Sequence, residues 1–108
     1  FRFVIQYTAA ATTTGSRWGL NGPGGTMRYR SEVSLTTTSV TTIEGSAAHD
    51  LPAASNASSA ATGANIAVIE GFYEATANGN VIARFASEVA SSAIVAKAGS
   101  VVYFQEVA

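Results

Sequence analysis

The dipeptide Asn78-Gly79 is the feature of this sequence that most constrains its fold. Asn-Gly between two apolar runs is the strongest short-range signal for a β-hairpin, because both residues tolerate the positive φ angles of a two-residue turn. We therefore predict that the runs on either side of it pair as antiparallel strands. The register of a two-residue loop places these residues opposite each other: Phe72 and Phe85, Tyr73 and Arg84, Glu70 and Ser87.

The predicted hairpin has one strongly apolar face, which we expect to belong to the core because side chains alternate along a strand. That face carries Ile66, Val68, Phe72, Val81, Ala83, Phe85 and Val89. The other face is apolar enough to be partly covered and carries Ile69, Tyr73, Ile82 and Arg84. A second turn, Lys97–Ser100, is expected to join a strand at 92–96 to a strand at 101–107.

The N-terminal third also alternates with period two. The segment 1–8 places Phe1, Phe3, Ile5 and Tyr7 on one face, which predicts a half-buried strand. A short strand is expected at 17–21, followed by a loop at 21–25 that contains Pro23. The segment 26–35 directs Met27, Tyr29, Val33 and Leu35 to one side, and the β-branched segment 36–44 is also strand-prone.

No segment gives a convincing amphipathic helix. The segment 87–98 is rich in alanine and open to either interpretation, but its short connections favour a strand. The low-complexity segment 45–64 is expected to be a long excursion or loop. We predict a single all-β domain over residues 1–108, an antiparallel β-sandwich of jelly-roll type with seven to eight strands. Its expected core is Phe3, Ile5, Leu20, Val33, Ile66, Val68, Phe72, Val81, Phe85, Val101 and Tyr103.

Composition excludes several kinds of partner. Charged residues make up 12% of the chain and the net charge is −1, so charge gives no basis for binding nucleic acid or an anionic membrane. No apolar run approaches the roughly 20 residues of a membrane-spanning helix, so no membrane insertion is expected. The chain has no cysteine, which excludes disulfides and thiolate metal sites. It begins Phe-Arg-Phe, so we expect a processed, truncated or partial chain.

Catalytic and metal-binding patterns are weak. His49-Asp50 is the one acid–base pair, and neighbours on an extended chain point to opposite faces. Glu70 and Glu74 share a face but lie about 13 Å apart along a strand, too far for a glycosidase pair. We expect Glu70 to lie near Arg84 or Arg28, or at a subunit interface. No catalytic, metal-binding or cofactor-binding residues are therefore assigned, and we do not expect an enzyme.

Four aromatic residues and one arginine are the candidate ligand or interface residues. Trp18, Tyr29, Tyr73 and Tyr103 are able to form a sugar-stacking platform, although Trp18 equally suits a core position. Arg84 opposite Tyr73 is expected to be a structural cation–π pair. The sequon at 56–58 matters only in a secreted eukaryotic protein.

Three segments together resemble a known family. ATTTGSRWGLNGP (11–23), NIAVIEGFY (65–73) and IARFASEVASSAIVAKAGS (82–100) resemble a small β-rich domain found near the C-termini of tailed-bacteriophage and prophage virion proteins. The segment 36–64 has no counterpart in that pattern. The resemblance implies a structural protein on the virion surface, of capsid-decoration, tail or tail-fibre type, which carries no active-site residues and usually assembles with copies of itself.

The low charge and the Thr-, Ser- and Ala-rich strands suit such a protomer, because they allow one strand face to bury against a neighbour. We predict a homotrimer that also contacts other capsid or tail proteins. Two alternatives stay open at this point. One is a carbohydrate- or receptor-binding module for a host-surface glycan, and the other is the subunit of an extracellular filament.

Overall fold

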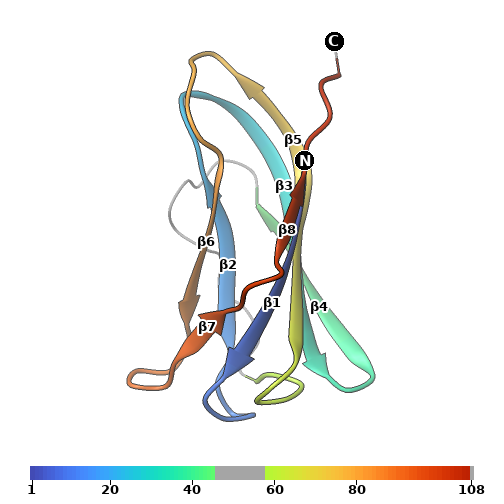
Figure 1. The fold of residues 1–108 in the computed structure, drawn as a ribbon, viewed down its shortest axis with the longest axis vertical. Helices are drawn as coiled ribbons and strands as arrows, with labels where there is room; N and C mark the ends of the chain where they lie inside the picture. Colours follow the sequence, from blue (N-terminus) through green and yellow to red (C-terminus); the bar gives the residue numbers. More distant parts are fainter. Residues whose placement is uncertain (46–57, 108) are drawn as a thin grey trace.

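The computed structural model describes residues 1–45 and 58–107 and is all-β across these ranges, with antiparallel strand pairs and no helix (Figure 1). The all-β prediction is confirmed. The helical alternative for 87–98 is wrong, because this segment forms turns followed by a short strand. The strands are β1 (Arg2–Ala9), β2 (Ser16–Asn21), β3 (Gly25–Thr36), β4 (Ser39–Gly45), β5 (Asn65–Ala75), β6 (Ile82–Ser87), β7 (Ile94–Ala96) and β8 (Val101–Tyr103).

The strands form two sheets of unequal width. The larger sheet has the order β4-β3-β5-β1-β7. β8 also pairs with β1, on the same edge as β7 but farther along it. The smaller sheet consists of β2 and β6. Figure 1 shows the two sheets facing each other, with the chain crossing between them at β1–β2, β2–β3, β5–β6 and β6–β7.

The core lies between the two sheets. The Tyr7 ring of the larger sheet lies 5.0 Å from the Trp18 ring of the smaller sheet, and Trp18 stacks on Phe85 at 4.9 Å. The buried indole N–H of Trp18 donates to the Ser16 hydroxyl over 2.8 Å, so its polar atom is satisfied. The buried apolar residues are Ile5, Tyr7, Ala9, Trp18, Leu20, Met27, Tyr29, Val33, Ala67, Ile69 and Ile94.

The period-two predictions of the N-terminal third are confirmed. β1, β2 and β3 lie where alternation places them, and their predicted inner faces contain buried residues such as Ile5, Leu20 and Val33. The loop predicted at 21–25 connects β2 to β3, with Gly25 beginning the strand.

The hairpin predicted at Asn78-Gly79 is wrong. β5 pairs with β1 and β3, whereas β6 pairs with β2, so the two strands belong to different sheets. Tyr73 lies opposite Met27 and not opposite Arg84. The six residues 76–81 are a crossover between sheets. The physical reason is that both edges of β5 already hydrogen-bond to other strands, which leaves no edge for β6 over most of its length.

The predicted core face of β5 is also wrong. Ile69 is fully buried, whereas Ile66 is 52% exposed and Phe72 is 71% exposed. Besides Ile69, the inner face of β5 carries small residues such as Ala67 and Gly71. A Cβ on Gly71 would lie 2.0 Å from the carbonyl oxygen of Arg28, so β3 and β5 approach closely there. Other predicted core residues that prove to be exposed are Phe85, Val89, Val101 and Tyr103.

The turn at Lys97–Ser100 does not join a hairpin. β7 and β8 both pair with β1 and run in the same direction along it. Tyr7 pairs with Ala96 and Val4 pairs with Val101. Between these two pairs β1 advances by three residues, whereas the segment from β7 to β8 advances by five. The two extra residues form a bulge within one continuous edge, in which Gly99 has a φ of 91°.

Candidate assembly interface

The side of the molecule between β6 and β8 is open. The smaller sheet has only two strands and covers part of the inner face of the larger sheet. A groove of about 290 Å³ lies along the uncovered part. Besides Lys97 and Ser100 it is lined by apolar side chains from both sheets: Phe3, Ile5, Ala83, Phe85, Ala96, Val101 and Val102. We call this the β6–β8 groove.

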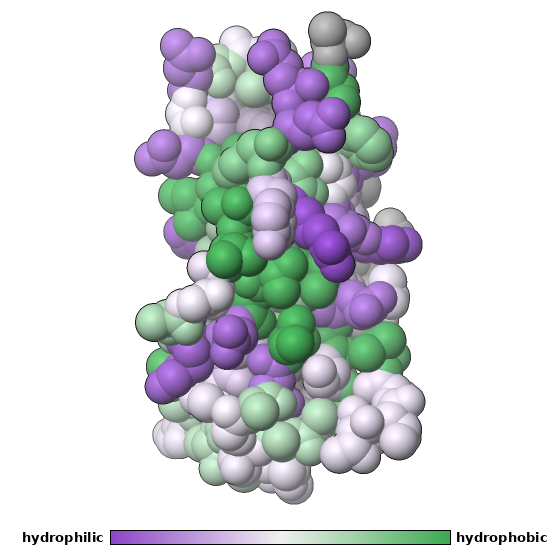
Figure 2. Space-filling model, turned by 45° about the vertical axis from the view of Figure 1, so that its right-hand side comes forward, coloured by the Kyte–Doolittle hydropathy of each residue, from purple (hydrophilic) through white to green (hydrophobic). Residues whose placement is uncertain are grey.

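The strand that borders this groove exposes a row of large apolar side chains. Val101, Val102, Tyr103 and Phe104 are all exposed, the last two to 61% and 62%. Figure 2, turned from Figure 1 so that its right-hand side comes forward, shows hydrophobic side chains gathered in a patch at mid-height. A long apolar edge of this kind is a site at which another chain can pair.

The backbone of β8 has hydrogen-bonding groups directed away from the sheet. Phe1 and Gly71 exchange two backbone hydrogen bonds of 3.0 and 3.1 Å, and the Lys97 N–H donates to the Gln6 carbonyl over 2.8 Å. The odd-numbered residues of β1 therefore face β5 and the even-numbered ones face β7 and β8. It follows that Val101 and Tyr103 turn their backbone groups toward β1, whereas Val102 turns its N–H and C=O toward the outer edge.

The bulge holds this edge in place. The Ser100 hydroxyl donates to the Lys97 carbonyl over 2.8 Å and accepts the Gln6 N–H over 3.1 Å. The same hydroxyl thus closes the turn and replaces one hydrogen bond of the ladder, so β8 continues along β1 after the extra residues.

The outer face of the larger sheet carries a row of charges. Glu70 accepts from Arg30 over 2.6 Å and lies 3.6 Å from Arg2. The expectation of an arginine near Glu70 is correct, but the partners are not the expected Arg84 and Arg28. Because all three side chains are substantially exposed, these ion pairs contribute modestly to stability.

A second ion pair lies on the smaller sheet. Arg17 makes two hydrogen bonds to Glu88, of 2.8 and 3.0 Å, and the hydrogen bond to Glu88 raises the pKa of Arg17. Glu70 and Glu88 therefore each bind arginine and do not pair as two carboxylates, and Glu74 is exposed on β5.

Of the five candidate residues from the sequence, only Tyr29 and Tyr73 come together, in the wall of one hollow on the larger sheet. Trp18 is 1% exposed and Tyr29 is also buried, which agrees with a core role and not with a stacking platform. Burial raises the pKa of the Tyr29 phenol, partly offset by a hydrogen bond from the Leu20 backbone. Tyr73 is half-buried and donates to the Pro23 carbonyl, whereas Tyr103 lies on the exposed β8 edge.

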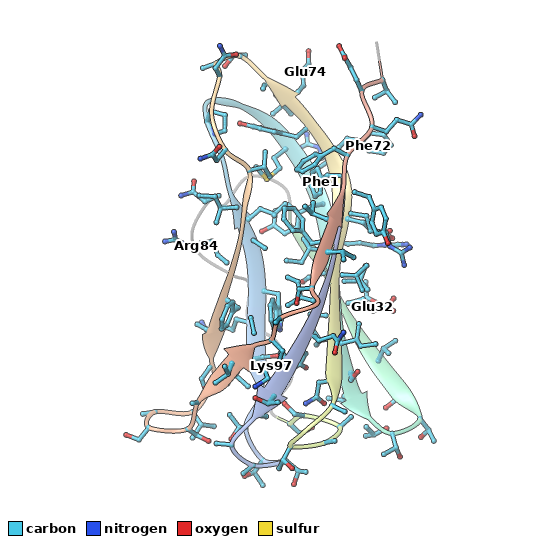
Figure 3. The ribbon with its side chains drawn as sticks, viewed as in Figure 1. Phe1, Glu32, Phe72, Glu74, Arg84 and Lys97 are labelled. Atoms are coloured by element: carbon cyan, nitrogen blue, oxygen red, sulfur yellow. The ribbon has the colours of Figure 1, made fainter. Side chains whose placement is uncertain are left out.

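Arg84 lies on the outer side of β6, opposite Gly19 of β2, and Figure 3 shows it directed away from the larger sheet. Its predicted pairing with Tyr73 is therefore wrong. Of the five residues only Tyr103 belongs to the candidate interface.

A larger hollow of about 840 Å³ lies where β5 extends beyond the start of β1, and Figure 3 shows Phe1 and Phe72 there. Its walls combine aromatic rings with Arg28, Arg30 and Glu70, and the segment after β8 forms the opposite side.

His49-Asp50 and Asn56 lie outside the described residues. Within residues 1–45 and 58–107 no group of three potential metal ligands occurs. No helix in the same ranges is long and apolar enough to span a membrane.

Sequence reasoning missed Val102 and Phe104 as interface residues. The apolar run 101–104 carries the signal, but alternation along it predicts a paired strand with Val101 and Tyr103 in the core. Only the topology shows that this strand is an edge of the larger sheet.

Comparisons with family models, with curated proteins and with solved structures find no match to this chain.

Proposed function

We propose that this chain is a non-enzymatic structural protein of the virion surface of a tailed bacteriophage, either a capsid-decoration protein or a tail-fibre component. It works by associating with copies of itself and with other capsid or tail proteins. In this proposal the two sheets form an open β-sandwich of jelly-roll type. The two-stranded sheet covers only part of the inner face of the larger sheet, so a neighbouring chain can bind on the uncovered part.

The observation that carries the proposal is the open side between β6 and β8. Large apolar side chains such as Phe85, Val102 and Phe104 are exposed beside a strand edge with outward-facing backbone groups. Exposed apolar edges promote aggregation in a monomer, and symmetric assembly covers them. The resemblance to phage virion domains supplies the biological setting.

The test is the absolute mass of the purified chain by light scattering on a sizing column, over a range of concentrations. A multiple of the 11.0 kDa chain mass supports self-assembly, and three times that mass supports the predicted homotrimer. An open-ended series of masses supports the filament alternative, since head-to-tail contacts do not close. A monomer at every concentration overturns self-assembly.

Glycan binding is a second candidate, favoured by the 840 Å³ hollow with its aromatic walls, arginines and Glu70. Because Trp18 is buried away from it, tryptophan fluorescence is a poor reporter. Calorimetric titration with host-surface polysaccharide, comparing the parent chain with Phe72→Ala, tests this candidate directly. Heat that the substitution abolishes supports glycan binding, and no heat with the parent chain rejects it.

A further inference from the structure

We propose that the β8 edge is the self-association surface and that it pairs antiparallel with β8 of a second copy about a two-fold axis through Val102. This inference rests on the proposed function and specifies its contact. The apolar run 101–104 contains no charge and no proline, so nothing in it opposes strand pairing.

The backbone favours this position of the axis. Antiparallel pairing about Val102 places Val102 opposite its own copy and Ser100 opposite Phe104 of the second copy. Val102 directs its N–H and C=O groups away from β1, and strand alternation continued by two residues at each side gives Ser100 and Phe104 the same direction. They therefore meet as hydrogen-bonded pairs, and the two larger sheets join into one continuous sheet.

The side chains are self-complementary in the same register. Val102 and Phe104 lie on the inner face, because Val102 pairs with Phe3 and the Phe104 ring lies 6.1 Å from the Phe3 ring. Phe104 of the second copy then lies over Ser100, which lines the β6–β8 groove beside Phe85. Each copy thus places an exposed aromatic ring into the apolar groove of the other.

Charge also supports a second copy of the chain as the partner that binds the β8 edge. Because the two bulge residues lie outside the ladder, the register places Glu106 of the second copy opposite Ala96, next to Lys97. Figure 3 shows Lys97 close to β7, at the lower end of this edge. Within the described residues neither Lys97 nor Glu106 forms an ion pair. The two-fold axis therefore creates two identical Lys97–Glu106 attractions at the ends of the paired segment.

A two-fold contact joins two copies, so by itself it produces a dimer and not the homotrimer that the sequence analysis favours. A trimer needs two different surfaces on each copy, whereas this edge is complementary to itself.

The experiment is mild oxidation of a Val102→Cys variant of the 108-residue chain, which has no native cysteine. Directly opposed residues in a hydrogen-bonded pair have Cα atoms about 5.5 Å apart, within disulfide range. The matched control is Val95→Cys, which is similarly exposed and lies on the same edge. Its two copies would lie roughly 40 Å apart in the proposed register.

The expected result is a covalent dimer for Val102→Cys and none for Val95→Cys.

Lys97→Glu should weaken association roughly fivefold or more by replacing two attractions with two repulsions, and the double variant Lys97→Glu/Glu106→Lys should restore it. Association by mass without the Val102→Cys cross-link overturns the β8 contact and leaves self-assembly standing. A chain that stays monomeric by mass overturns both proposals.

Discussion

At the scale of single residues, β5 carries two isoleucines with opposite environments. Ile69 lies on the inner face and is fully buried, whereas Ile66 lies on the outer face and is about half exposed. Ile69→Ala should therefore lower the free energy of unfolding by about 2–5 kcal/mol, and Ile66→Ala by less than about 1 kcal/mol. Urea unfolding of the two variants measures both changes. The reverse order would mean that the face predicted from the sequence is the core after all.

Gly71 is a residue-scale constraint on the pairing of β3 and β5. A Cβ at this position would lie 2.0 Å from the Arg28 carbonyl oxygen and 2.6 Å from the Tyr29 Cα, and backbone cannot move away as a side chain can. Gly71→Ala should cost at least about 1–3 kcal/mol of stability. The control is Gly63→Ala, where no atom lies within 4 Å and a small gain of about 0.4–1 kcal/mol is expected. Thermal melts that do not separate the two variants would contradict this account.

Tyr29 links folding to alkaline pH. Burial raises its pKa in the native state, so the native chain holds the phenol proton more tightly than the unfolded chain does. This contribution to stability is fully present below the unfolded pKa of about 10 and is lost as pH rises through the native pKa. Urea unfolding between pH 8 and 11 should show the loss. Tyr29→Phe should reduce it and Tyr103→Phe, at an exposed position, should not; an unchanged profile in Tyr29→Phe would assign the loss to other groups.

At the scale of elements, strands were predictable where one face is clearly richer in apolar bulk. β1, β2 and β3 alternate in this way, and their buried faces follow from period two alone. β5 has apolar residues on both faces, and its buried face carries the small residues Ala67 and Gly71. The larger apolar side chains of the other face therefore lead to the wrong prediction of the core face. The Asn78-Gly79 signal is local and contains no information about the strands that compete for β5. Pairing with β1 and β3 joins residues far apart in sequence, which no short motif encodes.

The pairing of β6 is an element-scale prediction. The structure places Arg17 opposite Ala86, so an Arg17→Cys/Ala86→Cys variant should form an intramolecular disulfide between β2 and β6. The matched control is Glu70→Cys/Ser87→Cys, which joins residues that face each other only in the hairpin register. Free-thiol titration after mild oxidation gives the result. Loss of thiols in the control alone would restore the hairpin between β5 and β6.

At the scale of the whole molecule, the candidate interface depends on topology more than on any motif. Composition predicted a protomer that buries surface against copies of itself, but it did not locate that surface. The fold does not gather the four aromatic candidates into one platform, since Trp18 lies in the core and Tyr103 on the β8 edge. The apolar run 101–104 became a candidate only when the sheet order made β8 an edge and the two-stranded layer left the adjoining groove open.

Association through β8 also predicts how the stability of the whole molecule depends on concentration. If copies pair in the native state and not when unfolded, mass action raises the Tm as protein concentration rises. Val102→Lys places a charge in the centre of the paired edge and should abolish this dependence while the monomer stays folded, because Val102 is exposed. Val40→Lys, also exposed but on β4 at the opposite edge of the larger sheet, should keep it. Calorimetric melts of the three proteins over a hundredfold range of concentration decide the matter. If Val40→Lys removes the dependence and Val102→Lys retains it, the copies associate through β4 and not through β8.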